Sequence, residues 1–226
     1  MIRHGESRFN ELNLFTGWLD VPLTEHGISE AQQAALHCKH YDYDAVFTSH
    51  LERAHETALV ILSLQKKIGI LKHKEHKWYS YTDGLAMHAD KIIPIYADRT
   101  LNERAYGVLQ GMNKRKAVEK FGETQVFKWR REFTYRPPQG ESLRDVYLRV
   151  IPYFKKTILP RIRRGETILI VGHGNTLRTV IKFLENIDDH NISFVNLPFG
   201  RPLVYEFDRN AFKRIEGAYD FERPLR

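Results

Sequence analysis

The sequence predicts an α/β protein: a single three-layer αβα domain whose largely parallel sheet is covered by helices on both faces. Short apolar stretches typical of buried strands alternate with longer amphipathic stretches typical of helices. The clearest strand, residues 168–172, is apolar up to a glycine and is followed by histidine, glycine and asparagine. Ligand sites in open α/β sheets lie at the carboxyl ends of such strands, so we expect a site beside residues 172–175.

The first strand and the loop that follows it are unusual. A central strand that ends at Arg3 and His4 has only two residues before it, so it is either very short or begins upstream of the recorded start. Residues 8–23 contain Gly17 and Pro22 and are expected to form an ordered loop. The short strand therefore bears on both the stability of the fold and the placement of His4.

A helix, a strand and a second helix follow. Thr24 is the expected N-cap of a helix over residues 25–40, and residues 44–49 form the next buried strand. The second helix begins at Leu51 and carries Arg53 in its first turn, beside the carboxyl end of the strand. The residues expected to face inward are Ile28, Ala31, Ala35 and Leu36 in the first helix and Ala54, Ala58, Leu59 and Leu62 in the second.

Residues 66–91 are the least informative part of the chain. Lysines alternate there with histidines and aromatic residues, a composition that favours an exposed insertion in the single domain of residues 1–226. A metal or nucleic-acid site built from His73, His76 and His88 is a weaker alternative, because these residues lack a regular ligand spacing. Residues 92–96 could form a strand, in which Pro94 favours an edge position or the first residues.

The second half of the chain alternates loops and helices before its last strands. Residues 101–111 are too polar for a core strand and too rich in glycine for a helix, and they are expected to form an ordered loop at the site. Helices are predicted over residues 113–121, 123–133 and 175–184, and the last strand over 203–207. A further long helix is capped by Ser142, after the break at Pro137, Pro138 and Gly140, and its expected inner face is Leu143, Tyr147, Val150, Ile151, Phe154 and Ile158.

Composition narrows the class of protein. Of 226 residues, 42% are hydrophobic and 28% are charged, which fits one sizeable core. No apolar stretch reaches transmembrane length, and no signal peptide opens the chain. The single cysteine, Cys38, fits a cytoplasmic location and excludes an internal disulfide. The net charge of +7 suits either a nucleic-acid partner or a small, highly charged anion, and the even spread of basic residues favours the anion.

Two histidines carry the chemistry that the sequence suggests. His4 lies between Arg3 and Gly5, and neutral imidazole is a side-chain nucleophile available near pH 7. The guanidinium can hold phosphoryl oxygens, and the glycine allows a phosphate close to the backbone. His173 lies between two glycines, which leave a buried structural histidine little to pack against. Each feature alone would fit an ordinary surface or core residue, but their recurrence at strand ends favours phosphoryl chemistry.

Several segments together resemble cofactor-dependent phosphoglycerate mutases, which belong to the histidine phosphatase superfamily. The first and last segments are shared by the superfamily, whereas 101–111 and 129–131 are specific to the mutases. The resemblance covers nearly the whole chain outside residues 66–91, and it implies a phosphoglycerate mutase-like fold. The segments that carry it are residues 3–7, 15–18, 101–111, 129–131, 137–143 and 172–175.

The resemblance implies a role for each matching residue. His4 would become phosphohistidine, His173 would stabilise the transferring group, and Arg3 and Arg53 would clamp its oxygens. Glu103 would be the general acid–base that serves the substrate hydroxyl. The remaining implied substrate-binding residues are Asn10, Thr16, Gly17, Arg104, Tyr106, Lys114, Arg130, Arg131, Gly174 and Asn175.

The implied reaction is the interconversion of 3-phosphoglycerate and 2-phosphoglycerate in glycolysis and gluconeogenesis. The cofactor 2,3-bisphosphoglycerate would serve as primer and intermediate, and no metal is expected. A small phosphorylated three-carbon acid is thus the expected partner, with no nucleic acid and no membrane. We also expect a homodimer or higher homo-oligomer, of a size that the sequence does not give.

Two alternatives remain open at this stage. A phosphatase on the same fold would use His4 and His173 but release the phosphoryl group to water. A basic, non-catalytic module that binds nucleic acid is less favoured, because the sequence carries no nucleic-acid motif. The sequence also departs from the family at Phe9, where tryptophan is usual, and at Thr176, where serine is usual. Its short segment after Pro138 and its brief C-terminal tail imply greater leakage to water.

Overall fold

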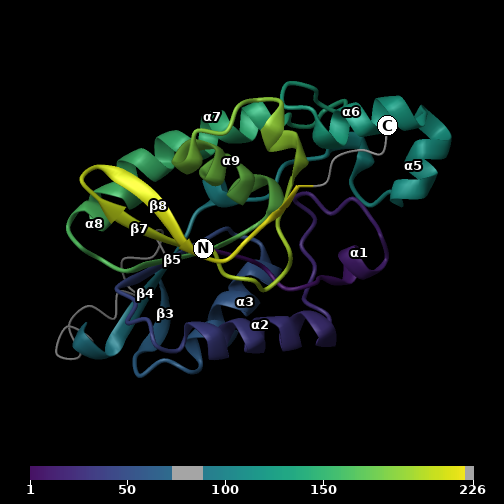
Figure 1. Ribbon diagram of the computed structural model, residues 1–226. Coiled ribbons are helices and arrows are strands. Elements are labelled where there is room, and N and C mark those ends of the chain that lie inside the picture. The colour runs from purple at the N-terminus through teal and green to yellow at the C-terminus, as the bar shows by residue number, and fades with distance from the viewer. Residues whose placement is uncertain (73–88, 222–226) are drawn as a thin grey trace.

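The computed structural model describes residues 1–72 and 89–221 and has a parallel sheet at its centre (Figure 1). The strands lie in the order β1-β5-β2-β4-β3, and each adjacent pair is parallel. The bounds are Ile2–Arg3 for β1, Ala45–Thr48 for β2, Ile68–Lys72 for β3, Ile92–Ala97 for β4 and Ile168–Gly172 for β5. The prediction of an α/β fold with a largely parallel sheet is confirmed.

Helices cover both faces of the sheet. Helices α2 (Glu25–Cys38) and α3 (Glu52–Leu62) lie on one face, whereas α7 (Leu143–Tyr153) and α9 (Gly174–Glu185) lie on the other (Figure 1). Side chains of a strand alternate between these faces: in β2, Val46 packs with the α2 and α3 residues and Phe47 with the α7 and α9 residues. Two apolar cores, one on each face, therefore hold the sheet in place.

A smaller lobe lies at one end of the molecule. It contains α1 (Arg8–Glu11), α5 (Lys114–Phe121) and α6 (Glu123–Arg131), at the opposite end from the hairpin of β7 (Val204–Asp208) and β8 (Ala211–Glu216) (Figure 1). The lobe has an apolar cluster of its own, built from Phe15, Leu109, Ala117 and Val126. The remaining elements are α8 (Leu159–Arg163), β6 (Val195–Asn196), β9 (Asp220–Phe221) and the short helical segments Ala89–Lys91, Arg99–Leu101, Gly107–Leu109, Phe154–Ile158 and Asn191–Phe194.

The ends of the sheet differ from the prediction. Strand β1 lies at one edge, beside β5, and is not a central strand. The segment predicted as an exposed insertion, 66–91, instead contributes β3, which forms the other edge. His73, His76 and His88, the residues of the alternative metal or nucleic-acid site, lie outside the described residues. The last predicted strand, 203–207, does not join the parallel sheet but pairs with β8 in an antiparallel hairpin.

Pro94 does not mark an edge strand. Strand β4 lies between β2 and β3, and Pro94 is its third residue. Strand β2 pairs with β4 only from Ile95 onward, so the missing N–H of Pro94 interrupts no pair with β2. A proline is thus tolerated inside a sheet at a position where the pairing with one neighbouring strand has not yet begun.

Three helix residues predicted to face inward are exposed. Ile28 and Leu36 of α2 are 40% and 51% exposed, and Leu59 of α3 is 52% exposed. The buried face of α2 is instead made of small residues, namely Gly27, Ala31, Ala34, Ala35 and Cys38. A face of small side chains allows the helix to lie close to its neighbours, and the larger residues then point outward. A short helix, α1, also occurs in the segment 8–23 that was expected to be a loop.

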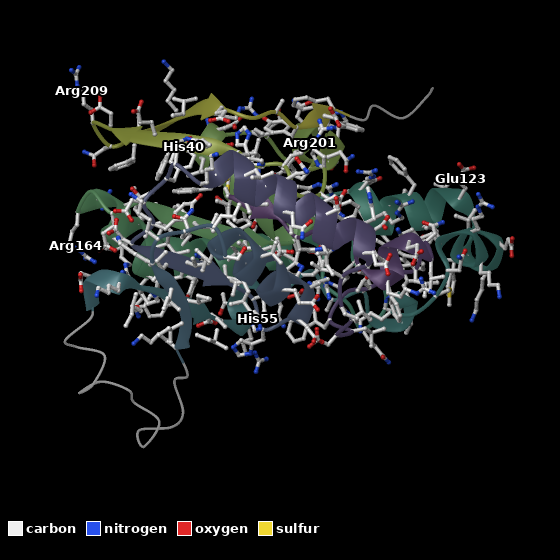
Figure 2. All side chains as sticks on the ribbon, turned by 90° about the horizontal axis from the view of Figure 1, so that it is seen from below. His40, His55, Glu123, Arg164, Arg201 and Arg209 are labelled. Atoms are coloured by element: carbon white, nitrogen blue, oxygen red, sulfur yellow. The ribbon has the colours of Figure 1, made fainter. Side chains whose placement is uncertain are left out.

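Most of the surface charge is spread around the molecule. The labelled side chains of Arg164, Arg201 and Arg209 project from different parts of the chain (Figure 2).

In the part of the chain that the structure describes, no helix combines the length and apolar character needed to cross a membrane.

The segment that carries His4 is held against α2 by direct contact between main chains. A Cβ atom on Gly5 would lie 2.2 Å from the carbonyl oxygen of Gly27, and one on Gly27 would lie 2.0 Å from the carbonyl oxygen of Glu6. The Glu6 N–H also donates to Glu30 Oε2 at 2.7 Å. Two glycines are therefore required where these backbones touch, and α2 fixes the position of His4.

We expect Gly27→Ala to destabilise the fold, although alanine normally favours a helix over glycine. The added methyl group cannot fit beside Glu6, and overpacking of this kind costs about 1–3 kcal/mol. Urea denaturation measures the loss, and Ser29→Ala, at an exposed position of the same helix, serves as the control. Equal unfolding free energies for the two variants would contradict the proposed contact.

Candidate active site

A cavity of about 420 Å³ lies at the carboxyl ends of the central strands. Its walls come from the loops after β1 and β5, from the first turn of α3 and from the lobe of α5 and α6. A cavity of this size suits a small ligand. The predicted site residues that line it are Arg3, His4, Asn10, Thr16, Gly17, Arg53, Glu103, Tyr106, Lys114, Arg130, Arg131, Gly174 and Asn175.

Two predicted site residues lie behind the wall of the cavity. His173 is fully buried, but its ring lies beside that of His4, with 5.0 Å between the ring centroids. Arg104 is also fully buried, and its Nη2 donates to the hydroxyl of Tyr106 and to the carbonyl of Arg130, both at 3.0 Å. The structure thus brings the two histidines together, and it places Arg104 where it supports two residues of the wall.

The ring of His4 is held in one tautomer. Its Nδ1 lies 2.6 Å from the carbonyl oxygen of Gly5, and because a carbonyl can only accept, Nδ1 carries the proton. The lone pair of Nε2 is therefore available as a nucleophile. Burial lowers the pKa of His4 well below its ordinary value, and the positive charges of Arg53 and Arg3 lower it further. His4 is thus neutral at neutral pH.

His173 is neutral for the same reasons. Burial lowers its pKa well below the ordinary value, with further lowering by Arg53, His4 and Arg3. Its Nε2 lies 2.7 Å from Ser49 Oγ, and that oxygen also accepts from the Leu51 N–H at 3.0 Å. The Nδ1 atom of His173 is buried, and it has no hydrogen-bond partner among the described residues. A buried polar atom of this kind is typical of a site that is completed by a ligand.

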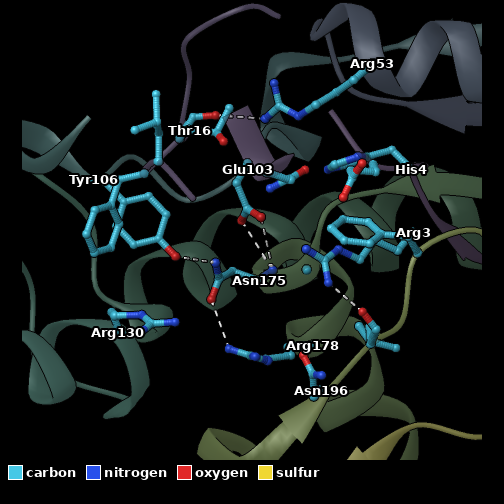
Figure 3. A pocket seen from close by; sticks show the side chains of 18 of the residues that line it. Arg3, His4, Thr16, Arg53, Glu103, Tyr106, Arg130, Asn175, Arg178 and Asn196 are labelled. Atoms are coloured by element: carbon cyan, nitrogen blue, oxygen red, sulfur yellow. Dashed lines mark hydrogen bonds between the residues drawn. The ribbon is translucent and has the colours of Figure 1, made fainter. Parts of the chain in front are cut away.

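The cavity has a large excess of positive charge. Six cationic side chains line it, against the two carboxylates of Glu6 and Glu103. Arg53 is held by carbonyl oxygens, with Nη2 donating to Gly17 at 2.9 Å (Figure 3) and Nη1 donating to Leu19 at 3.1 Å. Burial lowers the pKa of Arg53 to about 10, which still leaves it charged at neutral pH. The six cations are Arg3, Arg53, Lys114, Arg130, Arg131 and Arg178.

Glu103 lies at the amino end of α9. Its Oε1 accepts from the backbone N–H of Arg104 at 2.7 Å and from that of Asn175 at 3.2 Å (Figure 3). A carboxylate at this position satisfies a free N–H of the first helical turn and interacts favourably with the helix dipole. These bonds orient the carboxyl group beside the cavity, across from the histidine pair.

A chain of hydrogen bonds extends from Tyr106 through Asn175 to Arg178. Asn175 Nδ2 donates to the Tyr106 hydroxyl at 3.2 Å, and Arg178 Nη1 donates to Asn175 Oδ1 at 3.3 Å (Figure 3). Burial by itself raises the pKa of Tyr106, but the charge and hydrogen bond of Arg104 hold the pKa below its ordinary value. This series of hydrogen bonds fixes the side-chain amide of Asn175 with its oxygen directed toward Arg178.

Arg178 is the main residue that the sequence prediction missed. It is only 8% exposed, and within the described residues no carboxylate lies in ion-pair distance of its guanidinium. The pKa of Arg178 is lowered to about 9, mainly by burial and next by repulsion from Arg131. Its position three residues after Asn175, on the same helix face, was the available signal. The other lining residues that were not predicted are Glu6, Leu14, Phe15, Asn196, Leu197 and Phe199.

These features together support phosphoryl transfer through His4. A neutral nucleophilic imidazole faces a cavity whose cations can neutralise a highly charged anion. No group of three or more histidine, cysteine, aspartate or glutamate side chains suited to a metal ion occurs in residues 1–72 and 89–221.

Comparisons with known proteins identify the class. Residues 1–75 and 82–215 match the histidine phosphatase superfamily (branch 1). The fold resembles that of Bacillus stearothermophilus YhfR, with a TM-score of 0.74, 25% identity and coverage of 95% of this chain and 93% of the other. It also resembles the α-ribazole phosphatase of Shigella flexneri, with a TM-score of 0.70, 22% identity and coverage of 94% and 92%. The chain belongs to the histidine phosphatase superfamily.

The more similar relatives in sequence are mutases. The 2,3-bisphosphoglycerate-dependent phosphoglycerate mutase of Chlamydia muridarum is 43% identical over 220 residues, which cover 95% of each chain. That of Methanococcus vannielii is 39% identical over 216 residues, covering 95% of this chain and 92% of its own. Within the superfamily, the sequence is therefore similar to the bisphosphoglycerate-dependent mutases.

We expect His4 and His173 to remain neutral at pH 6, where about three quarters of an ordinary imidazole is protonated. Nitrogen chemical shifts should identify His4 as the Nδ1–H tautomer, because Gly5 accepts that proton. His4→Ala assigns the signal by removing it. A protonated His4 ring at pH 6 would contradict this account of the site.

The same lowered pKa values affect stability. At any pH between the lowered pKa values and the ordinary histidine pKa of about 6.5, the unfolded chain binds more protons than the folded chain. The contribution of these two histidines to stability is therefore complete above about pH 6.5 and is lost progressively as the pH falls below it.

Proposed function

We propose that this protein is a 2,3-bisphosphoglycerate-dependent phosphoglycerate mutase, which interconverts 3-phosphoglycerate and 2-phosphoglycerate. The observation that carries the proposal is the neutral His4–His173 pair in a cavity lined by six cations. Identity of about 40% with mutases over nearly the whole chain supports it, 41% in the relative from Methanosarcina acetivorans, for example. On this basis we place the protein in glycolysis and gluconeogenesis, in the cytoplasm, as a homo-oligomer.

The first step forms a bond between His4 Nε2 and phosphorus. The lone pair of Nε2 attacks the phosphoryl group, the bond from phosphorus to the donor oxygen breaks, and that oxygen takes a proton from Glu103. Arg3 and Arg53 bind the oxygens of the phosphoryl group and spread its negative charge. His173 donates a hydrogen bond to the same group, and Gly5 holds the proton on His4 Nδ1 throughout.

The second step runs in the reverse direction, from His4 to the 2-hydroxyl of 3-phosphoglycerate. Glu103 accepts the proton of the substrate hydroxyl, whose oxygen attacks phosphorus while the bond to His4 Nε2 breaks. Transfer to the 2-hydroxyl of 3-phosphoglycerate produces bound 2,3-bisphosphoglycerate, which then donates its 3-phosphoryl group back to His4 by the first step and leaves 2-phosphoglycerate. The bisphosphate must turn in the cavity before it donates that second phosphoryl group, and its total charge keeps it bound among the cations.

A second anionic subsite distinguishes this mechanism from simple hydrolysis. Lys114, Arg130, Arg131 and Arg178 line the cavity away from His4 and provide charge for the substrate carboxylate and its second phosphate. Burial and the nearby Arg130 lower the pKa of Lys114, so a bound anion would restore it. Further proposed contacts come from Asn10, Thr16, Gly17, Arg104, Tyr106, Gly174 and Asn175.

The residues present also fit the bisphosphate as primer. The excess of cations over carboxylates and the unpartnered buried atoms of Arg53 and His173 suit a ligand with two phosphate groups. When bound, 2,3-bisphosphoglycerate supplies the phosphoryl group that converts His4 to phosphohistidine. A phosphatase of the same superfamily is the alternative function, and it has no need of the second subsite.

A coupled assay with 3-phosphoglycerate should give 2-phosphoglycerate at a rate that depends on added 2,3-bisphosphoglycerate. His4→Ala should abolish both this activity and acid-labile labelling by the bisphosphate. His26→Ala, at an exposed histidine, is the matched control and should retain both. Fast release of inorganic phosphate without 2-phosphoglycerate would support the phosphatase instead.

Glu103→Gln should slow transfer to the substrate about 10²- to 10⁴-fold while the fold is retained, because general acid–base catalysis contributes a factor of this size. The amide oxygen can still accept from the Asn175 N–H, so the substitution removes the proton transfer and little else. Single-turnover labelling of His4 and subsequent transfer separate the two steps. An unchanged transfer rate would remove Glu103 from the mechanism.

A further inference from the structure

The loop of residues 197–200 is fastened to Arg3 at two points. Arg3 Nη1 donates to the carbonyl oxygen of Leu197 at 2.6 Å, and the Gly200 N–H donates to the carbonyl oxygen of Arg3 at 3.1 Å. One bond uses the side chain of Arg3 and the other uses its backbone. The two residues between these anchors, Pro198 and Phe199, are therefore held in register with Arg3 and His4.

The loop is also fixed on its other side. Leu197 is buried in the core that packs under α7 and α9. Gly200 has a φ of 60°, and a Cβ atom there would lie 2.8 Å from the carbonyl oxygen of Glu30 in α2. Only glycine fits this close approach in the left-handed region. The loop is thus a rigid part of the scaffold and not a freely moving flap.

The ring of Phe199 lies over the reacting groups. The Arg3 guanidinium carbon is 3.8 Å from the ring centroid, and the His4 ring centroid is 5.8 Å from it. Phe199 also lines the cavity, whose wall is otherwise mostly polar. Phe199 therefore adds an apolar surface to this wall directly beside the two reacting groups.

Stacking on the face of a guanidinium has a specific consequence. The N–H donors of arginine lie in the plane of the group, so a ring over the face leaves the donors at the edge available to oxygen atoms. Phe199 can therefore orient Arg3 without competing for its hydrogen bonds. The same ring lies beside the His4 ring, with 5.8 Å between the centroids, and so reduces the space open to water around a phosphoryl group on His4.

We propose that Phe199 is a positioning residue that limits hydrolysis of phosphohistidine, so that the phosphoryl group on His4 passes to the substrate hydroxyl. This inference rests on the proposed mutase function. In the competing reaction, the oxygen of a water molecule attacks phosphorus, the bond to His4 Nε2 breaks, and inorganic phosphate leaves. The proton lost by water goes to Glu103. The ring opposes this reaction by excluding water and by keeping Arg3 aligned for transfer.

The test compares three variants of the full chain. Phe199→Leu removes the aromatic face and reduces the cover, Phe199→Tyr keeps both, and Phe194→Leu is the control. Phe194 is partly buried and belongs to a nearby turn, but its ring packs against His190, 5.1 Å away between centroids. Thermal melts establish that each variant is folded before the rates are compared.

Two quantities are measured for each variant. One is the lifetime of labelled phosphohistidine in water without substrate, and the other is the ratio of inorganic phosphate to 2-phosphoglycerate formed during turnover. We expect Phe199→Leu to shorten the lifetime and raise the ratio about tenfold, equal to about 1.4 kcal/mol in barrier height. The KM for 3-phosphoglycerate should stay within about twofold, because the ring of Phe199 packs against Arg3 and His4, which act on the transferring group. Phe199→Tyr and Phe194→Leu should match the unmodified protein.

Each other outcome counts against the inference. An unchanged lifetime and ratio in a folded Phe199→Leu would overturn it, and so would an equal effect of Phe194→Leu, which would indicate a general loosening of the loop. If Phe199→Leu does not fold, Phe199→Met takes its place with the same expected increase. Failure of the mutase proposal itself would be seen separately, as a lack of 2-phosphoglycerate from the unmodified protein.

Discussion

The structure depends on keeping two imidazoles neutral among buried cations. Charged side chains in an apolar interior are ordinarily paired with carboxylates, which would cancel the potential that a phosphate needs. Here Arg53 is held by the carbonyls of Gly17 and Leu19, and Arg178 by that of Val195. Carbonyl oxygens solvate a guanidinium without neutralising it. The cavity therefore keeps its positive charge, and burial together with that charge holds the histidines in the unprotonated form in which one of them can react.

The scaffold serves this arrangement through its strand ends. Strands β1 and β5 lie side by side and in parallel, so the residues that follow them, His4 and His173, emerge at the same edge. The first turn of α3 supplies Arg53 from the end of β2, the next strand in the sheet. Three positions far apart in the sequence thus converge because three neighbouring parallel strands end together. The smaller lobe completes the cavity with Lys114, Arg130 and Arg131.

The sequence was most informative where the chemistry requires particular residues near the backbone. The histidines could be predicted because each has a glycine beside it at a strand end, and the strands because they are apolar and short. Arg178 could not, because an arginine in an amphipathic helix resembles a solvated surface residue until burial is known. Ile28, Leu36 and Leu59 were assigned to the core because large apolar residues ordinarily bury, whereas alanines form the actual contact face. Strand β3 was missed because the lysines around it suggested an exposed loop.

Carbonyl-held guanidinium groups recognise charge and tetrahedral shape, and little in them separates phosphorus from other central atoms. Sulfate and vanadate present the same outline of oxygens to Arg3, Arg53 and Asn175. Neither carries the carbon skeleton that would engage Arg130 and Arg131, so they would occupy only the half of the cavity beside the histidines. The choice of buffer anion is accordingly part of the chemistry of this protein, and a preparation in concentrated sulfate would be a partly inhibited one.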